Sequence, residues 1–322
     1  MSTNEAGAAA PADPRRWLAL GILLIANFMN LIDVTIVNVA LPSMRDNLGA
    51  SDAQIEWVVA AYVLAFALGL LPFGRLGDIV GRTRMFLIGV AAFTLASGLC
   101  GMAQSIEMLI GARVLQGLGG AMMTPQVLAI ATVTFPPEER GQAFSLFGLS
   151  AGLASVCGPV LGGLLIDAQL FGLDWQPIFL VNIPIGIAAI IAGWFLIPRL
   201  PGHSELRNDY VGIILFGLGI VAVVFPIIEG RALGWPAWSF AMMAAGVCLL
   251  ILFYFWQKRR ARAGQPQLLN YDLLANRDYM FGAFVVTVFA SGIPGLFLVI
   301  SLLLQSGFGF TPLQSGLTNL PF

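Results

Sequence analysis

Hydrophobic runs of roughly 20 residues alternate with short polar segments along most of the chain. An α-helix rises ~1.5 Å per residue, so each run is long enough to cross the ~30 Å hydrocarbon core of a bilayer. The pattern predicts an all-α polytopic membrane protein with nine complete spans and the start of a tenth after Thr311. The nine spans are expected at residues 17–41, 55–73, 85–104, 108–128, 141–166, 176–197, 211–229, 238–257 and 280–303.

The composition agrees with this pattern. Hydrophobic residues make up 58% of the 322, charged residues make up 10%, and the mean hydropathy is +0.87. So little polar surface cannot cover a soluble globule of this size, which places the chain in a lipid bilayer. The first 16 residues are polar and small, and the run after them is too long for a signal peptide, so we expect a flexible cytoplasmic tail.

The basic residues indicate an orientation. Thirteen lysines and arginines fall in one set of alternate connections, whereas only Arg45 and Arg231 fall in the other. The positive-inside rule assigns the richer set, and with it the amino terminus, to the cytoplasm of a cell membrane. A net charge of −1 gives no sign of a nucleic-acid partner. The thirteen are Arg15, Arg16, Arg75, Arg82, Arg84, Arg140, Arg199, Arg207, Lys258, Arg259, Arg260, Arg262 and Arg277.

Few residues are available for catalysis. His203 is the only histidine in the sequence, and Cys100, Cys157 and Cys248 fall inside predicted spans. A zinc cluster or a Ser/His/Asp triad cannot be built from these residues. We therefore expect no metal, no cofactor and no enzymatic activity.

Asp33 is the most informative residue, because it places a carboxylate inside the first predicted span. An acid at the centre of a membrane helix costs roughly 2.5 to 3.5 kcal/mol, so it needs a partner, a water-filled cavity or a proton. Arg113 in the fourth span lies ~9 Å below the outer face, and Asp33 lies ~14 Å below it, by helix rise. The two charges can form a proton-binding pair or a structural ion pair that fixes helix register.

The segment 74–89, "GRLGDIVGRTRMFLIG", predicts a tight cytoplasmic turn. Its glycines permit close helix approach and positive φ angles, its aspartate can accept hydrogen bonds near a helix start, and its arginines lie at the membrane surface. The residues expected to act in this turn are Gly74, Asp78, Gly81, Arg82 and Arg84.

The same segment resembles the signature loop of the major facilitator superfamily, although Ile79 replaces a basic residue that is common there. Five further segments resemble motifs of its drug:proton antiporter branch, which has fourteen predicted spans. The chain departs from the motifs of this branch at three positions, Ala154, Gln176 and Pro177. The blocks are "LIDVTIVNVALP" at 31–42, "RVLQGLGGAM" at 113–122, "CGPVLGG" at 157–163 with "IFLVNIPIG" at 178–186, and "GFTPLQSGLTNLP" at 309–321.

This resemblance implies a fold of two six-helix bundles with two helices inserted between them. Residues 1–16 would be the tail, 17–200 the complete first bundle, 201–269 the inserted pair and its connections, and 270–322 the start of an incomplete second bundle. We accordingly expect a fragment or truncated product of a protein of roughly 480 to 520 residues, judged from the length used per span.

The resemblance also implies roles for particular residues. Asp33 and Arg113 would carry proton coupling. A bent, closely packed pivot in the fifth span would consist of Gly158, Pro159, Gly162 and Gly163. A substrate cavity suited to lipophilic cations would use Asn38, Gln116, Met29, Trp57 and Tyr62, with Phe28 and Phe147 as further apolar bulk.

The implied function is proton-coupled efflux of lipophilic, possibly cationic, drugs or toxic compounds by a monomeric antiporter. Two alternatives stay open at this point. The chain can instead be a dedicated exporter of one metabolite, or a non-transporting membrane scaffold or sensor built on half of a transporter. An integral-membrane enzyme is the least favoured class, because the sequence contains no histidine and carboxylate cluster or nucleophile pair.

Overall fold

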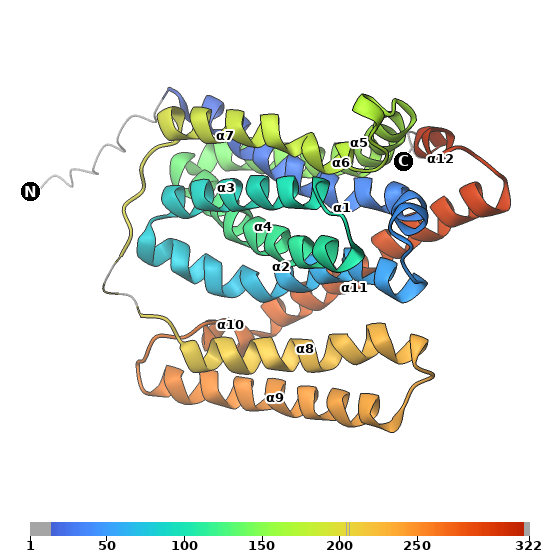
Figure 1. The fold of residues 1–322 in the computed structure, drawn as a ribbon. Coiled ribbons are helices and arrows are strands. Elements are labelled where there is room, and N and C mark those ends of the chain that lie inside the picture. Colours follow the sequence, from blue (N-terminus) through green and yellow to red (C-terminus); the bar gives the residue numbers. More distant parts are fainter. Residues whose placement is uncertain (1–13, 204, 206, 319–322) are drawn as a thin grey trace, which may run out of the picture.

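The computed structural model describes residues 14–203, 205 and 207–318, and these residues form a helical protein (Figure 1). The first bundle contains α1 (Arg16–Leu48), α2 (Asp52–Val80), α3 (Arg82–Gly101), α4 (Ile106–Thr134), α5 (Pro137–Asp167), the short η1 (Leu170–Gly172), α6 (Pro177–Leu180) and α7 (Asn182–Leu196). After it come α8 (Tyr210–Ala232), α9 (Ala237–Arg262), α10 (Tyr271–Ala275), α11 (Arg277–Leu302), η2 (Leu303–Gly307) and α12 (Pro312–Thr318).

Eight helices among the described residues are long and apolar enough to cross a membrane, with α6 and α7 forming one span. They correspond in order to the first eight predicted spans. The 26-residue helix α11 occupies the place of the ninth, and α12 lies where the tenth is expected to begin. The predicted all-α polytopic architecture is therefore confirmed over the described part of the chain.

Three apolar clusters form the core of the first bundle, and the two larger ones flank Asp33. One cluster includes Ile36 and Val37 of α1 with Leu109 of α4. The other includes Leu23 of α1 and Phe93 of α3. Along α1, the buried Asp33 lies where one cluster gives way to the other, so the polar site is enclosed by apolar packing on both sides.

Local sequence fixes the helix ends around this core. Ser51 and Gln54 form a capping box at the start of α2, and Ser105 caps α4 by accepting from the backbone N–H of Met108. Gly49 ends α1 in the left-handed conformation, with φ of 63°. These caps satisfy backbone groups that would otherwise lack partners at the helix ends.

The junction of α2 and α3 differs from the predicted turn over 74–89. Helix α2 continues to Val80 and α3 begins at Arg82, so Gly81 alone joins them, with φ of 111°. Gly74 and Asp78 consequently lie in the last turns of α2 rather than in a loop or near a helix start. The glycines do not break α2 because that part of the helix packs closely on Pro125 and Gln126 of α4.

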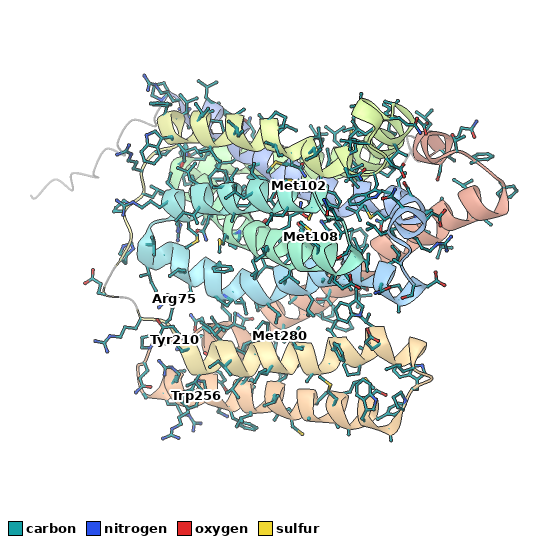
Figure 2. All side chains as sticks on the ribbon, in the orientation of Figure 1. Arg75, Met102, Met108, Tyr210, Trp256 and Met280 are labelled. Atoms are coloured by element: carbon teal, nitrogen blue, oxygen red, sulfur yellow. The ribbon has the colours of Figure 1, made fainter. Side chains whose placement is uncertain are left out.

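Helices α8 and α9 form an antiparallel hairpin, and α8 packs against α2 (Figure 1). The base of the hairpin, beside Tyr210 and Trp256 in Figure 2, is held by the buried carboxylate of Asp209. This carboxylate accepts hydrogen bonds from Trp256 Nε1 at 3.0 Å, Gln257 Nε2 at 2.8 Å and the Gly212 backbone N–H at 3.0 Å. The inserted pair thus has its own polar anchor.

Two ends of the molecule can be distinguished. We call the end where α1 begins and α2 meets α3 the basic end, because Arg16, Arg82 and Arg84 lie there. The opposite end, where α1 meets α2 and α8 meets α9, is called the far end (Figure 1).

Candidate functional site

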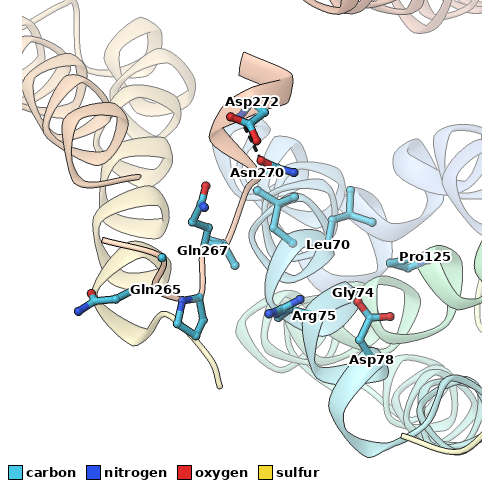
Figure 3. Close-up of a pocket in the computed structure, with 13 residues that line it drawn as sticks. Leu70, Gly74, Arg75, Asp78, Pro125, Gln265, Gln267, Asn270 and Asp272 are labelled. Atoms are coloured by element: carbon cyan, nitrogen blue, oxygen red, sulfur yellow. Dashed lines mark hydrogen bonds between the residues drawn. The ribbon is translucent and has the colours of Figure 1, made fainter. Parts of the chain in front are cut away.

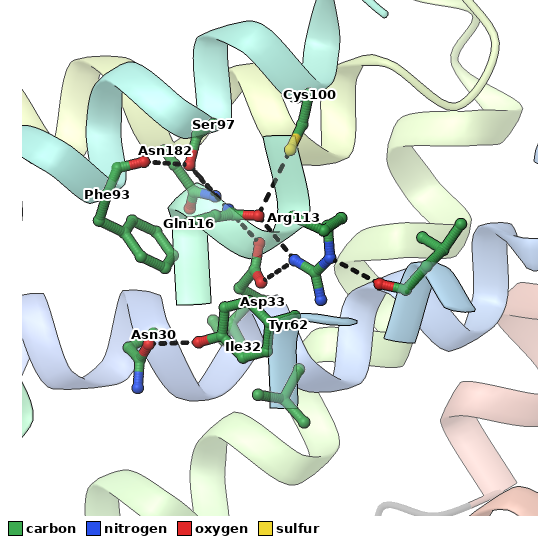
Figure 4. Close-up of polar contacts among 12 residues, drawn as sticks. Asn30, Ile32, Asp33, Tyr62, Phe93, Ser97, Cys100, Arg113, Gln116 and Asn182 are labelled. Atoms are coloured by element: carbon green, nitrogen blue, oxygen red, sulfur yellow. Dashed lines mark hydrogen bonds and ion pairs between the residues drawn. The ribbon is translucent and has the colours of Figure 1, made fainter. Parts of the chain in front are cut away.

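Asp33 of α1 and Arg113 of α4 are in direct contact inside the first bundle (Figure 4). Arg113 Nη1 donates to Asp33 Oδ2 at 2.5 Å, and both residues are fully buried. Helix rise had placed the two residues at comparable depths, and the structure also turns them toward each other. A fully buried ion pair is costly unless further hydrogen bonds satisfy its remaining atoms.

Gln116 supplies those bonds from the next turn of α4. Its Nε2 donates to Asp33 Oδ1 at 2.8 Å and to Ser97 Oγ at 2.8 Å, while its Oε1 accepts from Arg113 Nη1 at 2.7 Å. Asn182 at the start of α7 donates to the same Ser97 oxygen at 3.4 Å. Sequence analysis did not single out Ser97 or Asn182, although each is a polar residue within a predicted apolar span.

Helix α2 supports the other edge of the guanidinium. Arg113 Nε donates to the backbone carbonyl of Val58 at 2.9 Å, and its Cζ lies 4.2 Å from the centre of the Tyr62 ring. The Tyr62 hydroxyl donates to Asn30 Oδ1 at 2.5 Å. The cation is therefore held by a carboxylate of α1 and by a backbone carbonyl and an aromatic face of α2.

Helices α1 and α5 approach each other closely beside Asp33. A Cβ on Gly158 would overlap Thr35, and one on Gly162 would press on Ile36. Thr35 Oγ1 also donates to the carbonyl of Ala154 on α5 at 3.2 Å. The other two predicted pivot residues are on the same helix: Pro159 lies inside α5, and Gly163 is buried. Small residues on α5 thus let it pack against the segment of α1 that carries the acid.

The residues predicted for a substrate cavity do not surround one space. Met29 and Tyr62 are buried in the core, and Gln116 is part of the Asp33 network. Trp57 Nε1 donates to Glu229 of α8, a carboxylate that sequence analysis did not single out. Asn38 lines a cavity of 610 Å³ between α1, α2 and α8. Their roles toward a substrate stay predictions.

Phe28 and Phe147, the further apolar bulk expected around a substrate, are partly buried and pack against different core clusters.

The predicted gating residues cluster at the basic end. Asp78 Oδ1 accepts from Arg82 Nε at 3.1 Å, and Arg82 Nη1 donates to the carbonyl of Ala129 at 3.2 Å. The Asp78 carbonyl accepts from the backbone N–H of His203, which draws the segment after α7 onto this junction. Arg84 is exposed.

Asp78 also lines a cavity of 730 Å³ between the end of α2 and the segment that follows α9 (Figure 3). Gly74 and Arg75 lie on its α2 side, and Gln267 and Asp272 lie on the other. The cavity therefore separates the predicted gating junction from the connection toward α11.

No metal site is evident among residues 14–203, 205 and 207–318, where no group of three or more histidine, cysteine or acidic side chains converges.

Comparison with known proteins gives the family. Residues 23–210 match the model of the Major Facilitator Superfamily. The chain is 44% identical over 315 residues to the "Probable actinorhodin transporter" of Streptomyces coelicolor, covering 98% of this chain and 54% of that protein. It is 36% identical over 321 residues to "Puromycin resistance protein pur8" of Streptomyces alboniger, covering 98% of this chain and 62% of that protein.

A solved structure shares the fold. The POT family transporter PepTSo superposes with a TM-score of 0.60 at 15% identity, covering 96% of this chain and 67% of that one. The chain spans about half the length of the first curated relative that it matches. Because the family model matches more than half of the chain, and the fold agrees with it, the chain belongs to the Major Facilitator Superfamily.

Proposed function

We propose that the protein containing this chain exports small lipophilic molecules across a membrane in exchange for protons. The observation that carries this proposal is the fully buried contact of Asp33 with Arg113 and Gln116. The names of the relatives, an actinorhodin transporter and a puromycin resistance protein, support export of small molecules.

The proposed coupling follows from competing effects on Asp33. The guanidinium of Arg113 stabilises the carboxylate, whereas exclusion of water stabilises the protonated acid. A displacement of Arg113 by even a small distance therefore changes whether Asp33 holds a proton. In this scheme the ion pair is one state of the cycle, and a protonated Asp33 with Arg113 turned away is the other.

The rest of the site would serve the conformational change. We propose that the α2–α3 junction around Asp78 and Arg82 gates the basic end, and that α5 pivots on α1 at Gly158. Residues 17–200 would act as the first bundle and 201–269 as the inserted pair. The positive-inside rule supports a cytoplasmic basic end and amino terminus in a cell membrane.

Proteoliposomes with an imposed pH gradient test this function, with ethidium as the transported probe. We expect gradient-driven ethidium movement by the wild-type protein and its loss in Asp33→Asn. The matched control is Asp46→Asn, the same substitution on the same helix at an exposed site. Gradient-driven ethidium movement that survives in Asp33→Asn would contradict the assignment of proton coupling to Asp33.

A further inference from the structure

A cavity of 460 Å³ lies at the basic end, between the start of α3 and the segment that follows α7. The two helices pack on each other (Figure 1), and a Cβ on Gly193 of α7 would press on Leu87 of α3. The lining combines the apolar side chains of Leu87 and Trp194 with the guanidinium groups of Arg84 and Arg199. The volume falls within the roughly 300 to 1,000 Å³ range of pockets that hold small ligands.

The charged groups of this cavity are basic. Arg84 and Arg199 are both exposed, and no acidic side chain is found among the lining residues that the structure describes. The ion pairs formed within the described part of the chain involve neither guanidinium. Two like charges on one cavity favour an anion between them, and guanidinium groups bind phosphate oxygens in a bidentate manner. The cavity therefore has the chemistry for a phosphate group.

The start of α3 adds to the attraction for an anion. The first turn of α3 contains Arg82 and Arg84 but no acidic residue, and Gly81 offers no side chain to cap the helix. The positive end of the helix dipole, which favours a negative group, is therefore left without one from this turn.

The buried Thr83 fixes the backbone on both sides of Arg199. Its Oγ1 donates to the carbonyl of Pro198 at 2.6 Å and accepts from the backbone N–H of Leu200 at 3.4 Å. The Arg199 Cζ also lies 5.3 Å from the centre of the Trp194 ring. Contacts from α3 and α7 thus hold this charge at the cavity, which lowers the entropy that a ligand must remove on binding.

The surroundings of the cavity favour a lipid as the source of the phosphate. Trp194 is 59% exposed, and Ile191, one turn earlier on α7, is 56% exposed. Ile88, one turn after Arg84 on α3, is 51% exposed. Both helices are long and apolar enough to cross a membrane, so these faces offer acyl chains a surface next to the two arginines. Basic pockets between membrane helices bind anionic lipid headgroups in this way.

We propose that this cavity binds the phosphate of an anionic phospholipid, with Arg84 and Arg199 on the headgroup and Trp194 beside an acyl chain. The site is separate from the Asp33 network and does not depend on the transport proposal. The segment that carries Arg199 also covers the α2–α3 junction, where a Cβ on Gly202 would overlap the carbonyl of Ile79. A bound lipid ties this segment to α3 and so stabilises the junction.

Native mass spectrometry of the full chain in neutral detergent, titrated with dioleoylphosphatidylglycerol, tests the proposal. We expect a saturable lipid adduct on the wild-type protein. Its dissociation constant should rise roughly tenfold or more in Arg84→Gln/Arg199→Gln, because both phosphate contacts are lost. The matched control is Arg259→Gln/Arg262→Gln, which removes two exposed arginines of α9 at the same end and should change affinity by less than about twofold.

Further arms address the kind of ligand and the integrity of the fold. Dioleoylphosphatidylcholine, whose choline group cancels the phosphate charge, should bind the wild type at least about threefold more weakly. An equal concentration of inorganic phosphate should not displace phosphatidylglycerol, because it cannot use the apolar wall. Arg199→Gln alone, with an expected loss of about threefold, provides a second variant should the double variant fail to fold.

Three outcomes would overturn the proposal. Equal losses in the two arginine pairs would show that the lipid responds only to total charge, and equal affinities for the two lipids would remove the preference for an anion. Displacement by an equal concentration of inorganic phosphate would assign the site to a soluble anion. Because none of these measurements involves flux, this inference and the transport proposal fail separately.

Discussion

Arg113 Nη1 lies 2.5 Å from Asp33 Oδ2, with both side chains withdrawn from solvent. The same guanidinium donates through Nε to Val58, so helices α1, α2 and α4 meet at one cation. Each of these contacts offsets part of the desolvation cost of burying the two charges. The pair therefore supports the packing of the bundle as well as its proposed chemistry.

Removing one partner of this pair should be strongly destabilising. Arg113→Ala leaves Asp33 as an uncompensated buried charge or forces it to take a proton, and we expect a loss of roughly 3 to 5 kcal/mol. The double variant Asp33→Leu/Arg113→Met replaces both charges with apolar side chains and should recover most of that loss. Reversible unfolding in mixed micelles measures both, and a double variant as unstable as Arg113→Ala would contradict the account.

Close packing of α5 on α1 predicts a second effect. In Gly158→Ala the new methyl group meets Thr35, so we expect destabilisation of about 1 to 3 kcal/mol from overpacking. Gly152→Ala is the control, because a Cβ there meets nothing within 4 Å and the residue lies on the same helix. In thermal unfolding, Gly158→Ala should have a lower melting temperature than Gly152→Ala. Equal melting temperatures would show that the two helices do not pack at Gly158 as described.

The single-residue link between α2 and α3 predicts a third effect. Gly81 has φ of 111° and approaches the carbonyl of Leu200, so Gly81→Ala should cost roughly 1 to 3 kcal/mol through backbone strain. Gly74→Ala places its methyl group in ordinary contact with Pro125 and serves as the control. Limited proteolysis should cut Gly81→Ala faster near this junction. Unchanged cleavage relative to Gly74→Ala would argue against a strained link.

The sequence could predict the spans and the meeting of Asp33 with Arg113 for a simple physical reason. Bilayer thickness and helix rise fix the depth of each residue, and a buried charge is costly enough to demand a partner. Neutral residues such as Ser97 and Asn182 carry no comparable cost, so nothing in the sequence distinguished them from helix-packing polar groups. Their place in the network became visible only with the helices packed.

Tertiary packing also determines two features that the sequence did not predict, the full length of α2 and the contact between α2 and α8. The glycines around Gly74 suggested a turn, but their fit against α4 allows α2 to remain helical as far as Val80. Likewise, the bond of Trp57 to Glu229 depends on where the inserted hairpin docks, which hydrophobic periodicity does not encode. The cavity beside that bond exists only because α8 packs on α2.

The most direct test of the central claim is proton release on ligand binding, followed with a pH indicator in weakly buffered detergent. Tetraphenylphosphonium added to the wild-type protein or to the Asp46→Asn control should change the number of bound protons. The same addition to Asp33→Asn should produce no change, because the titrating group is absent. An equal proton signal from Asp33→Asn would contradict the claim that Asp33, held by Arg113, is the group that exchanges the proton.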